Sequence, residues 1–340
     1  MKQVSPSQSR PNVHFSELHM DRRKRLPTTE KRNPRSANVD TLPTLEIVDL
    51  INSEDRSVPE AVGSQRESIT AAIDLIVDCF REGGRLFYVG AGTSGRLGVL
   101  DASECPPTFG VKRSMVQGII AGGKRALVRS IEGAEDDVEG GAAEIDKKKV
   151  TSRDVVVGLA ACGVTPFVHG ALRRAKQLGA QTVCVTCAPE VVESIPAEII
   201  INPVVGPEVV TGSTRMKAGT ATKLVLNLLT TSAMIKLGKV HGNLMVDLQA
   251  VNKKLRDRSL RIVVELTALS RPKARALLQR ADGKVKPAVV MHFRNVDLPG
   301  AVKILGACGQ SLRKAMEPRG GENRDPKSEL RNKSKGPRLK

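Results

Sequence analysis

Five short apolar runs alternate with helical patterns through the middle of the chain. The runs are rich in valine, isoleucine and leucine, and helical periodicity separates several of them, most clearly at 166–178. Strands that alternate with helices predict a parallel sheet covered on both faces. Ligands of such sheets bind beyond the carboxyl ends of the strands, so functional residues are expected just after each run. The runs lie at residues 85–89, 116–121, 154–160, 181–186 and 198–202.

Helical patterns continue on both sides of this region. Residues 44–52 and 67–81 are expected to be helical, and a long pattern at 213–237 follows the last strand. Beyond residue 252 the composition changes and predicts short helices. We therefore expect an α/β domain over 41–254 and a small helical domain over 255–316. The short helices are predicted at 262–269, 271–281, 285–294 and 301–314.

The formal charge of +18 first suggests a nucleic acid or an anionic surface as a partner. Half of the excess lies at the two ends: residues 1–40 carry nine Lys or Arg against four Asp or Glu, and 317–340 carry eight against four. Their polar, Pro-containing composition predicts a disordered basic arm over 1–40 and a disordered basic tail over 317–340. With no Trp and one Tyr to stack on bases, nucleic acid is not expected as a partner.

The six cysteines are scattered through apolar segments. Cys184 and Cys187 have the spacing of a metal or redox pair, but they lie in a predicted strand with no second pair nearby, so neither role is expected. The first residues contain no continuous apolar stretch, and no segment reaches 18 apolar residues. We expect a cytoplasmic protein that uses no metal and does not enter a membrane.

A glycine-rich loop follows the first predicted strand. The stretch 90–96 (GAGTSGR) matches the pattern G-x-G-x-x-G of dinucleotide-binding folds, which is a weak signal alone. The next strand ends without the acidic residue that would hold a ribose. The loop instead carries two hydroxyls, Thr93 and Ser94, between Gly92 and Gly95. Backbone N–H groups at a helix start, together with hydroxyl donors, suit a phosphate monoester.

Two further loops have the same character. Small residues and a helix start combine at 160–166, which includes Cys162, Gly163 and Thr165. At 206–220 hydroxyls and two cations gather at the start of the long helix, and this stretch holds Glu208, Ser213 and Thr214. These features by themselves predict a sugar-phosphate or nucleotide site on an α/β sheet.

Acidic residues occur in two places where they can serve catalysis or merely flank a helix. Glu104 precedes two prolines that restrict the direction of the chain, although in isolation a surface helix that ends at this glutamate explains the pattern better. The stretch 132–137 (EGAEDD) can instead open a helix, where acidic residues complement the helix dipole.

Several long strings resemble the bacterial N-acetylmuramic acid 6-phosphate etherases. The strings occur in the order of that family and cover about residues 40–316. The resemblance implies a sugar isomerase (SIS) domain, which is a flavodoxin-like parallel α/β/α sandwich, with a small C-terminal helical domain and a homodimeric assembly. The strings are GAGTSGRLG at 90–98, DASECPPT at 101–108, EGAED at 132–136, TGSTRMKAGT at 211–220 and GKVHGNLMVD at 238–247.

The family resemblance also implies a reaction. Its members cleave the D-lactyl ether of N-acetylmuramic acid 6-phosphate and release N-acetylglucosamine 6-phosphate and D-lactate, without a cofactor. The open-chain sugar has an aldehyde that acidifies its C2 proton, so a carboxylate can remove that proton while an acid protonates the departing oxygen. By position, Glu104 matches the family's proton donor and Glu135 its second catalytic acid, the expected base. Thr93 and Ser94 would hold the phosphate, with Ser213 and Thr214 lining the same cleft.

The chain departs from the family at the third loop. The family usually has AASGRTPY there, whereas this chain has Cys162 for serine, Val164 for arginine and Phe167 for tyrosine. A thiol is a weaker donor than a hydroxyl, and loss of a hydrogen bond to a charged group costs about 1.5–3 kcal/mol. The substitutions therefore predict weaker affinity or a changed sugar acid.

Two other functions stay open. A sugar-phosphate-sensing regulator, like the animal glucokinase regulatory protein, would fit the altered third loop but would not need Glu104 and Glu135. An aldose–ketose phosphosugar isomerase would share proton abstraction at C2 but needs no acid for a leaving group. Replacement of Glu104 should then have little effect.

Overall fold

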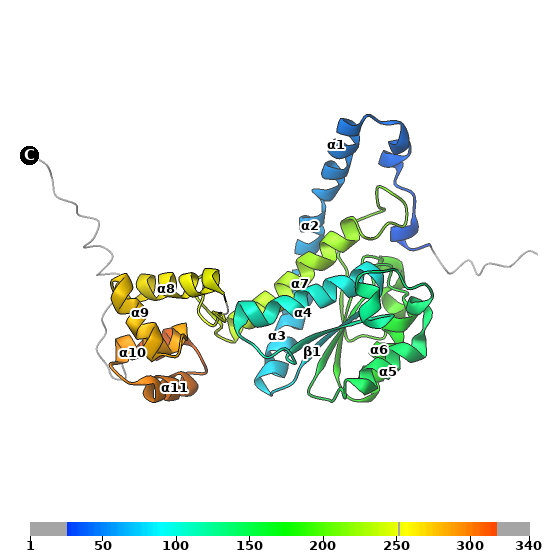
Figure 1. Cartoon of the computed structure of the whole chain (residues 1–340). Helices are drawn as coiled ribbons and strands as arrows, with labels where there is room; N and C mark the ends of the chain where they lie inside the picture. The colour runs from blue at the N-terminus through cyan, green and yellow to red at the C-terminus, as the bar shows by residue number, and fades with distance from the viewer. Residues whose placement is uncertain (1–25, 251, 318–340) are drawn as a thin grey trace, which may run out of the picture.

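The computed structural model describes residues 26–250 and 252–317 and contains a five-stranded parallel sheet between two helical layers (Figure 1). The strands are β1 Leu86–Gly90, β2 Val116–Ile120, β3 Val155–Leu159, β4 Gln181–Val185 and β5 Ile199–Ile201. All five predicted strands are confirmed to within two residues at each end. Their order, β2-β1-β3-β4-β5, is that of flavodoxin-like folds, which confirms the expected fold class.

Successive strand residues point to opposite faces and so divide the core into two layers. Leu86 and Tyr88 pack on one face beneath helices of which α3 (Arg66–Arg81), α4 (Gly92–Phe109) and α7 (Lys217–Lys236) are the longest. Phe87 and Val89 pack on the other face beneath α5 (Val138–Lys147) and α6 (Pro166–Gln177). The apolar runs lack alternation because both faces of the sheet are buried.

The C-terminal helices have a core of their own (Figure 1). This core also takes in Val246 and Leu248, which precede the boundary expected at residue 254. A two-stranded hairpin, β6 (Val240–His241) and β7 (Leu244–Met245), connects α7 to this part of the chain. The helices are α8 Lys253–Thr267, α9 Arg271–Arg280, α10 Val285–Arg294, α11 Leu298–Ala307 and α12 Leu312–Met316.

Several helix predictions differ from the structure. The helix expected at 301–314 is two helices, because Gly309 and Gln310 both have positive φ and interrupt it. The helix expected from residue 262 begins at 253, where Asn252 accepts a hydrogen bond from the amide of Leu255 (2.8 Å). Helix α4 continues through Pro106 and Pro107, so it does not end at Glu104.

The N-terminal segment departs from the disordered arm expected over 1–40. Residues 1–25 lie outside the described part, as does the predicted tail from residue 318 onward. Residues 28–41 form three short 3-10 turns, which lead into α1 (Thr44–Asp55) and α2 (Val58–Gly63). Helix α1 projects from the sheet region (Figure 1).

In the described ranges, no helix is long and apolar enough to cross a membrane.

Candidate phosphosugar site at the sheet's carboxyl edge

The loop after β1 lies at the point where the strand order reverses. Gly90 at the end of β1 pairs in register with Leu159 at the end of β3, so the loops that follow these two strands emerge side by side. A crevice between such neighbouring strands is where open parallel sheets bind ligands. The structure therefore brings the predicted loops 90–96 and 160–166 to one edge.

Helix α4 begins immediately after β1 and lies unusually close to the strand end. A Cβ atom on Gly95 would lie 2.7 Å from the carbonyl oxygen of Gly90, so only glycine permits this approach. The N-cap residue, Ala91, supplies no capping side chain, and the first turn has no acidic residue. Its amides, with the hydroxyls of Thr93 and Ser94, form the type of anion site found at helix starts.

The start of α7 meets the same loop. The position that a Cβ atom of Gly219 would occupy lies 3.7 Å from Cγ2 of Thr93 and 3.3 Å from the carbonyl oxygen of Thr214. The structure thus places Thr93 beside the segment that contains Ser213 and Thr214. Arg96, which the sequence analysis did not select, follows this loop and lines a pocket with Gly92. Arg96 could have been selected from the sequence because it directly follows the glycine-rich pattern that ends at Gly95.

Glu208 occupies a structural position. It is fully buried, and its two carboxylate oxygens accept hydrogen bonds from the amides of Lys217 and Ala218, both at 2.9 Å. Burial raises the pKa of Glu208, and these amides and the Lys217 charge oppose that rise. Glu208 therefore caps the start of α7, and its predicted contact with a ligand stays a prediction.

The structure shows where the three substituted residues of the third loop lie. Cys162 Sγ lies 3.9 Å from the Thr165 hydroxyl, and His169 Nε2 lies 2.7 Å from the carbonyl oxygen of Gly163. Phe167 is 3% exposed and packs in the core on the α5–α6 face of the sheet. Val164 is 46% exposed, so the residue at this position faces outward.

Glu135 reaches the candidate site from the segment after β2. It is exposed in a 3-10 turn (Ala134–Asp136) and lines a pocket of about 250 Å³ with Gly92 and Arg96. Arg96 also donates to the carbonyl oxygens of Leu127 and Arg129, which holds this segment against α4. The structure therefore brings Glu135 to the same pocket as the first residue of α4.

Glu104 lies elsewhere on α4. It is exposed and stands twelve residues after Gly92, which corresponds to about 18 Å along the helix axis at 1.5 Å per residue. It does not line the pocket that contains Glu135. Within one chain, the two predicted catalytic glutamates therefore do not face the same cavity.

A buried polar cluster fixes α4 one turn before Glu104. The Asp101 carboxylate accepts hydrogen bonds from the Tyr88 hydroxyl (3.2 Å) and the Thr230 hydroxyl (3.0 Å), and Lys223 Nζ lies 3.1 Å away. Burial, followed by the Asp101 charge, holds the pKa of Tyr88 well above its usual value. The cluster ties α4 to β1 and α7 and so sets the orientation of the helix that carries Glu104.

The described residues contain no cluster of three or more His, Cys, Asp or Glu that could hold a metal ion. Cys184 and Cys187 are fully buried, and burial raises the pKa of each thiol to about 12. A thiol with such a pKa stays protonated near neutral pH and makes a poor ligand or nucleophile.

Two comparisons concern the sheet region. The glucokinase regulatory protein N-terminal SIS domain matches residues 68–176. A solved structure of a phosphoheptose isomerase from Francisella tularensis is 16% identical with a TM-score of 0.41, and the match covers 54% of this chain and 98% of that chain.

Two curated relatives are far more similar. The N-acetylmuramic acid 6-phosphate etherase of Trichormus variabilis is 54% identical over 288 residues, which are 85% of this chain and 94% of that protein. The N-acetylmuramic acid 6-phosphate etherase of Yersinia pestis (strain Pestoides F) is 52% identical over 85% of this chain and 98% of that protein. Because more than half of the aligned positions are identical over nearly the full length of both relatives, the chain belongs to the N-acetylmuramic acid 6-phosphate etherase family.

Proposed function

We propose that this protein is a carbon–oxygen lyase that cleaves the D-lactyl ether of N-acetylmuramic acid 6-phosphate. The observation that carries the proposal is the 52–54% identity with proteins named for this activity. The site supports it, since a helix start with free hydroxyls suits a phosphate monoester and an exposed carboxylate lines the adjoining pocket.

We assign the groups as follows. The sugar phosphate binds the first turn of α4 and the hydroxyls of Thr93 and Ser94, with Thr214 alongside. Glu135 removes the C2 proton of the open-chain sugar, and the electron pair forms the C2–C3 double bond as the C3–O bond breaks. Glu104 protonates the departing lactate oxygen. Water then adds to C3 and a proton returns to C2, which gives N-acetylglucosamine 6-phosphate and D-lactate.

The separation of the two glutamates favours a homodimer with shared sites. About 18 Å of helix between Gly92 and Glu104 exceeds the length of an amino sugar, so one chain does not place both glutamates on one substrate. Leu100, one turn before Glu104, is 45% exposed, and the adjoining helix α7 exposes Leu228 and Ile235. We propose that a second copy packs on this apolar face and that each copy presents Glu104 to its partner's phosphate site.

D-lactate release from N-acetylmuramic acid 6-phosphate tests the reaction. Glu104→Gln and Glu135→Gln should each lower the rate about 10²–10⁴-fold, the usual contribution of general acid or base catalysis. Glu139→Gln is the matched control, because Glu139 is exposed at the start of α5. A folded parent protein that binds the sugar phosphate without releasing D-lactate would exclude the etherase function.

Co-expression of the two inactive variants tests the shared site. A dimer that combines one Glu104→Gln chain with one Glu135→Gln chain has one intact site, so random pairing should restore about a quarter of the parent rate. A mixture that stays inactive, although mixed dimers form, would refute the exchange of Glu104 between copies.

The match to the glucokinase regulatory protein N-terminal SIS domain favours one second candidate, a sugar-phosphate-sensing regulator. A regulator would bind the sugar phosphate with unchanged affinity after Glu104→Gln and would release no D-lactate. In either case we propose a cytoplasmic location, which the six free cysteines support.

A further inference from the structure

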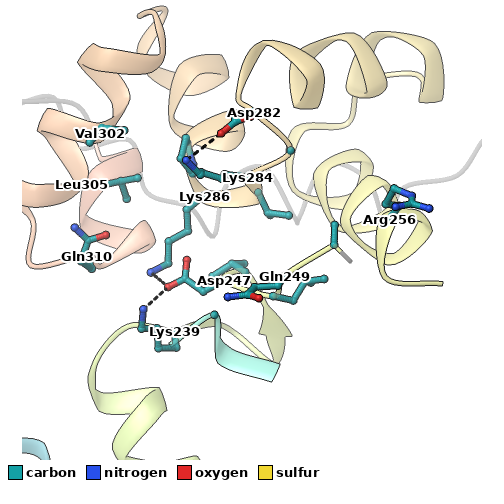
Figure 2. A pocket seen from close by; sticks show the side chains of 17 residues that line it. Lys239, Asp247, Gln249, Arg256, Asp282, Lys284, Lys286, Val302, Leu305 and Gln310 are labelled. Atoms are coloured by element: carbon teal, nitrogen blue, oxygen red, sulfur yellow. Dashed lines mark hydrogen bonds and ion pairs between the residues drawn. The ribbon is translucent and has the colours of Figure 1, made fainter. Parts of the chain in front are cut away.

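A second cavity lies away from the glycine-rich loop, between the end of α7 and the C-terminal helices. It has a volume of about 690 Å³, within the range of small-molecule sites, and shares no lining residue with the pocket that holds Glu135. Figure 2 shows Lys239 and Lys286 reaching the Asp247 carboxylate from two sides, with Val302, Leu305 and Gln310 on one wall. Lys239 and Asp247 belong to the string 238–247, for which the proposed reaction gives no role.

The charged groups that line this cavity have an excess of positive charge. Lys239 Nζ (3.1 Å) and Lys286 Nζ (2.7 Å) both contact the same oxygen, Oδ2 of Asp247, so these three groups carry a net charge of about +1. Asp282 and Lys284 at the rim compensate each other (3.2 Å). Arg256 on α8 adds a further positive charge at the opposite side of the cavity (Figure 2).

Lys286 is buried, so its positive charge is shielded from water and depends on nearby anions. Its side chain is 2% exposed. Burial lowers the pKa of Lys286, Asp247 opposes that shift, and Lys239 adds to it. Lys239 and Lys286 share the Asp247 carboxylate, so a second anion would stabilise both ammonium groups.

The remaining lining indicates the shape of the ligand. The first turn of α10 faces the cavity, carries no acidic residue and receives no capping side chain from Lys284. Pro287 has no N–H, so the amides of Val285 and Lys286 are the first-turn donors that can complement an anion. Val302 and Leu305 form an apolar wall. With Arg256 included, the cavity lining as a whole carries a net charge of about +2 and so attracts a phosphate monoester, which carries about −1.5 to −2 at pH 7.

We propose that this cavity is a second binding site, specific for a small organic phosphate. The phosphate lies between Lys239 and the first turn of α10, and the organic part lies against Val302 and Leu305. The cavity also adjoins the end of α4, because a Cβ atom on Gly110 would lie 2.2 Å from the carbonyl oxygen of Asp247. This inference does not depend on the proposed etherase function.

Titration calorimetry of the full chain with phenyl phosphate tests the site. The parent protein should show two classes of site, one at the glycine-rich loop and one in this cavity. Val302 is 52% exposed, so polar replacements there leave folding intact. Val302→Asp should weaken the cavity site at least about tenfold through charge repulsion, whereas the matched uncharged variant Val302→Asn should change it about threefold or less. Lys239→Gln should weaken it about tenfold.

Three results would overturn the proposal. One is equal binding by the parent, Val302→Asp and Lys239→Gln. A second is equal affinity of the cavity for inorganic phosphate and phenyl phosphate, because the apolar wall would then contribute nothing. A third is loss of D-lactate release in Val302→Asp, which would make the cavity part of the catalytic site. D-lactate release by the parent, measured on the same preparation, separates failure of this proposal from failure of the etherase function.

Discussion

The buried carboxylate of Glu54 connects the N-terminal segment to α7, and its replacement should be strongly destabilising. Glu54 is 7% exposed at the end of α1, and Lys217, the first residue of α7, is 3% exposed. Oε2 of Glu54 accepts hydrogen bonds from Lys217 Nζ (2.6 Å) and Asn33 (2.8 Å), while Oε1 accepts one from Arg35 (2.6 Å). One carboxylate therefore serves as a shared acceptor for two cations and one side-chain amide.

The change Glu54→Gln preserves the size of the side chain and removes its charge. The ammonium of Lys217 then stays buried without its hydrogen-bonded counter-charge, and such losses cost about 3–5 kcal/mol. That is a large share of the 5–15 kcal/mol by which folded proteins are usually stable. Urea unfolding followed by circular dichroism measures the loss as a lower midpoint. Glu60→Gln on α2, where the glutamate is exposed, is the control and should change stability by less than about 0.5 kcal/mol.

A loss of stability below about 1 kcal/mol for Glu54→Gln would refute this reasoning, because the buried Glu54–Lys217 ion pair would then contribute no more than an exposed ion pair does. The double change Glu54→Leu with Lys217→Met should recover most of the stability, because apolar residues of similar volume often replace a buried ion pair well. If the double variant is less stable than Glu54→Gln, the buried charge on Lys217 is not the source of the loss.

Three further predictions concern other parts of the structure. Gly95→Ala should destabilise the protein by about 1–3 kcal/mol in thermal unfolding, because its Cβ atom would lie 2.7 Å from a carbonyl oxygen, whereas Gly63→Ala meets nothing within 4 Å and should not destabilise it. Burial raises the pKa of Glu190, but hydrogen bonds from Lys31 and Thr28 outweigh it and lower this pKa to about 2. The contribution of Glu190 to stability is therefore present above pH 4.5 and is lost as the pH falls toward 2. In acid unfolding experiments, Glu190→Gln should lack this loss of stability between pH 4.5 and 2. Asp101→Leu should cost about 1–3 kcal/mol by leaving the buried Tyr88 hydroxyl without its acceptor, and an unchanged unfolding temperature would contradict this role.

The sheet was the most predictable part of the structure. Both of its faces are buried, so each strand is a continuous apolar run, and turn residues bound it. The C-terminal helices were harder to delimit. The first turns of α8 are strongly basic and hide its apolar stripe, although Asn252 is a recognisable N-cap. Pro106 and Pro107 would usually end a helix, and packing of Cys105 and Phe109 into the core keeps α4 helical through them.

The candidate site was predictable only in part. The positions of Thr93 and Glu135 follow from local strings, and the strand order then brings their loops to one edge. The buried capping role of Glu208 depends on a contact with a helix nine residues later, which no local pattern specifies. The separation of Glu104 from Glu135 arises from the length of α4, and only the folded helix shows it.

The contacts of residues 28–36 have a consequence for the motions of the site. Thr28 binds Glu190, Asn33 donates to the carbonyl oxygen of Pro207, and Ser36 donates to that of Val209. The segment between β5 and α7 has no strand or helix of its own at 203–216, and the contacts of Asn33 and Ser36 help to hold it. Amide hydrogen exchange in this loop should therefore follow the opening of the N-terminal segment. A protease that cuts near residue 36 would loosen the Ser213–Thr214 side of the proposed phosphate site without touching the sheet.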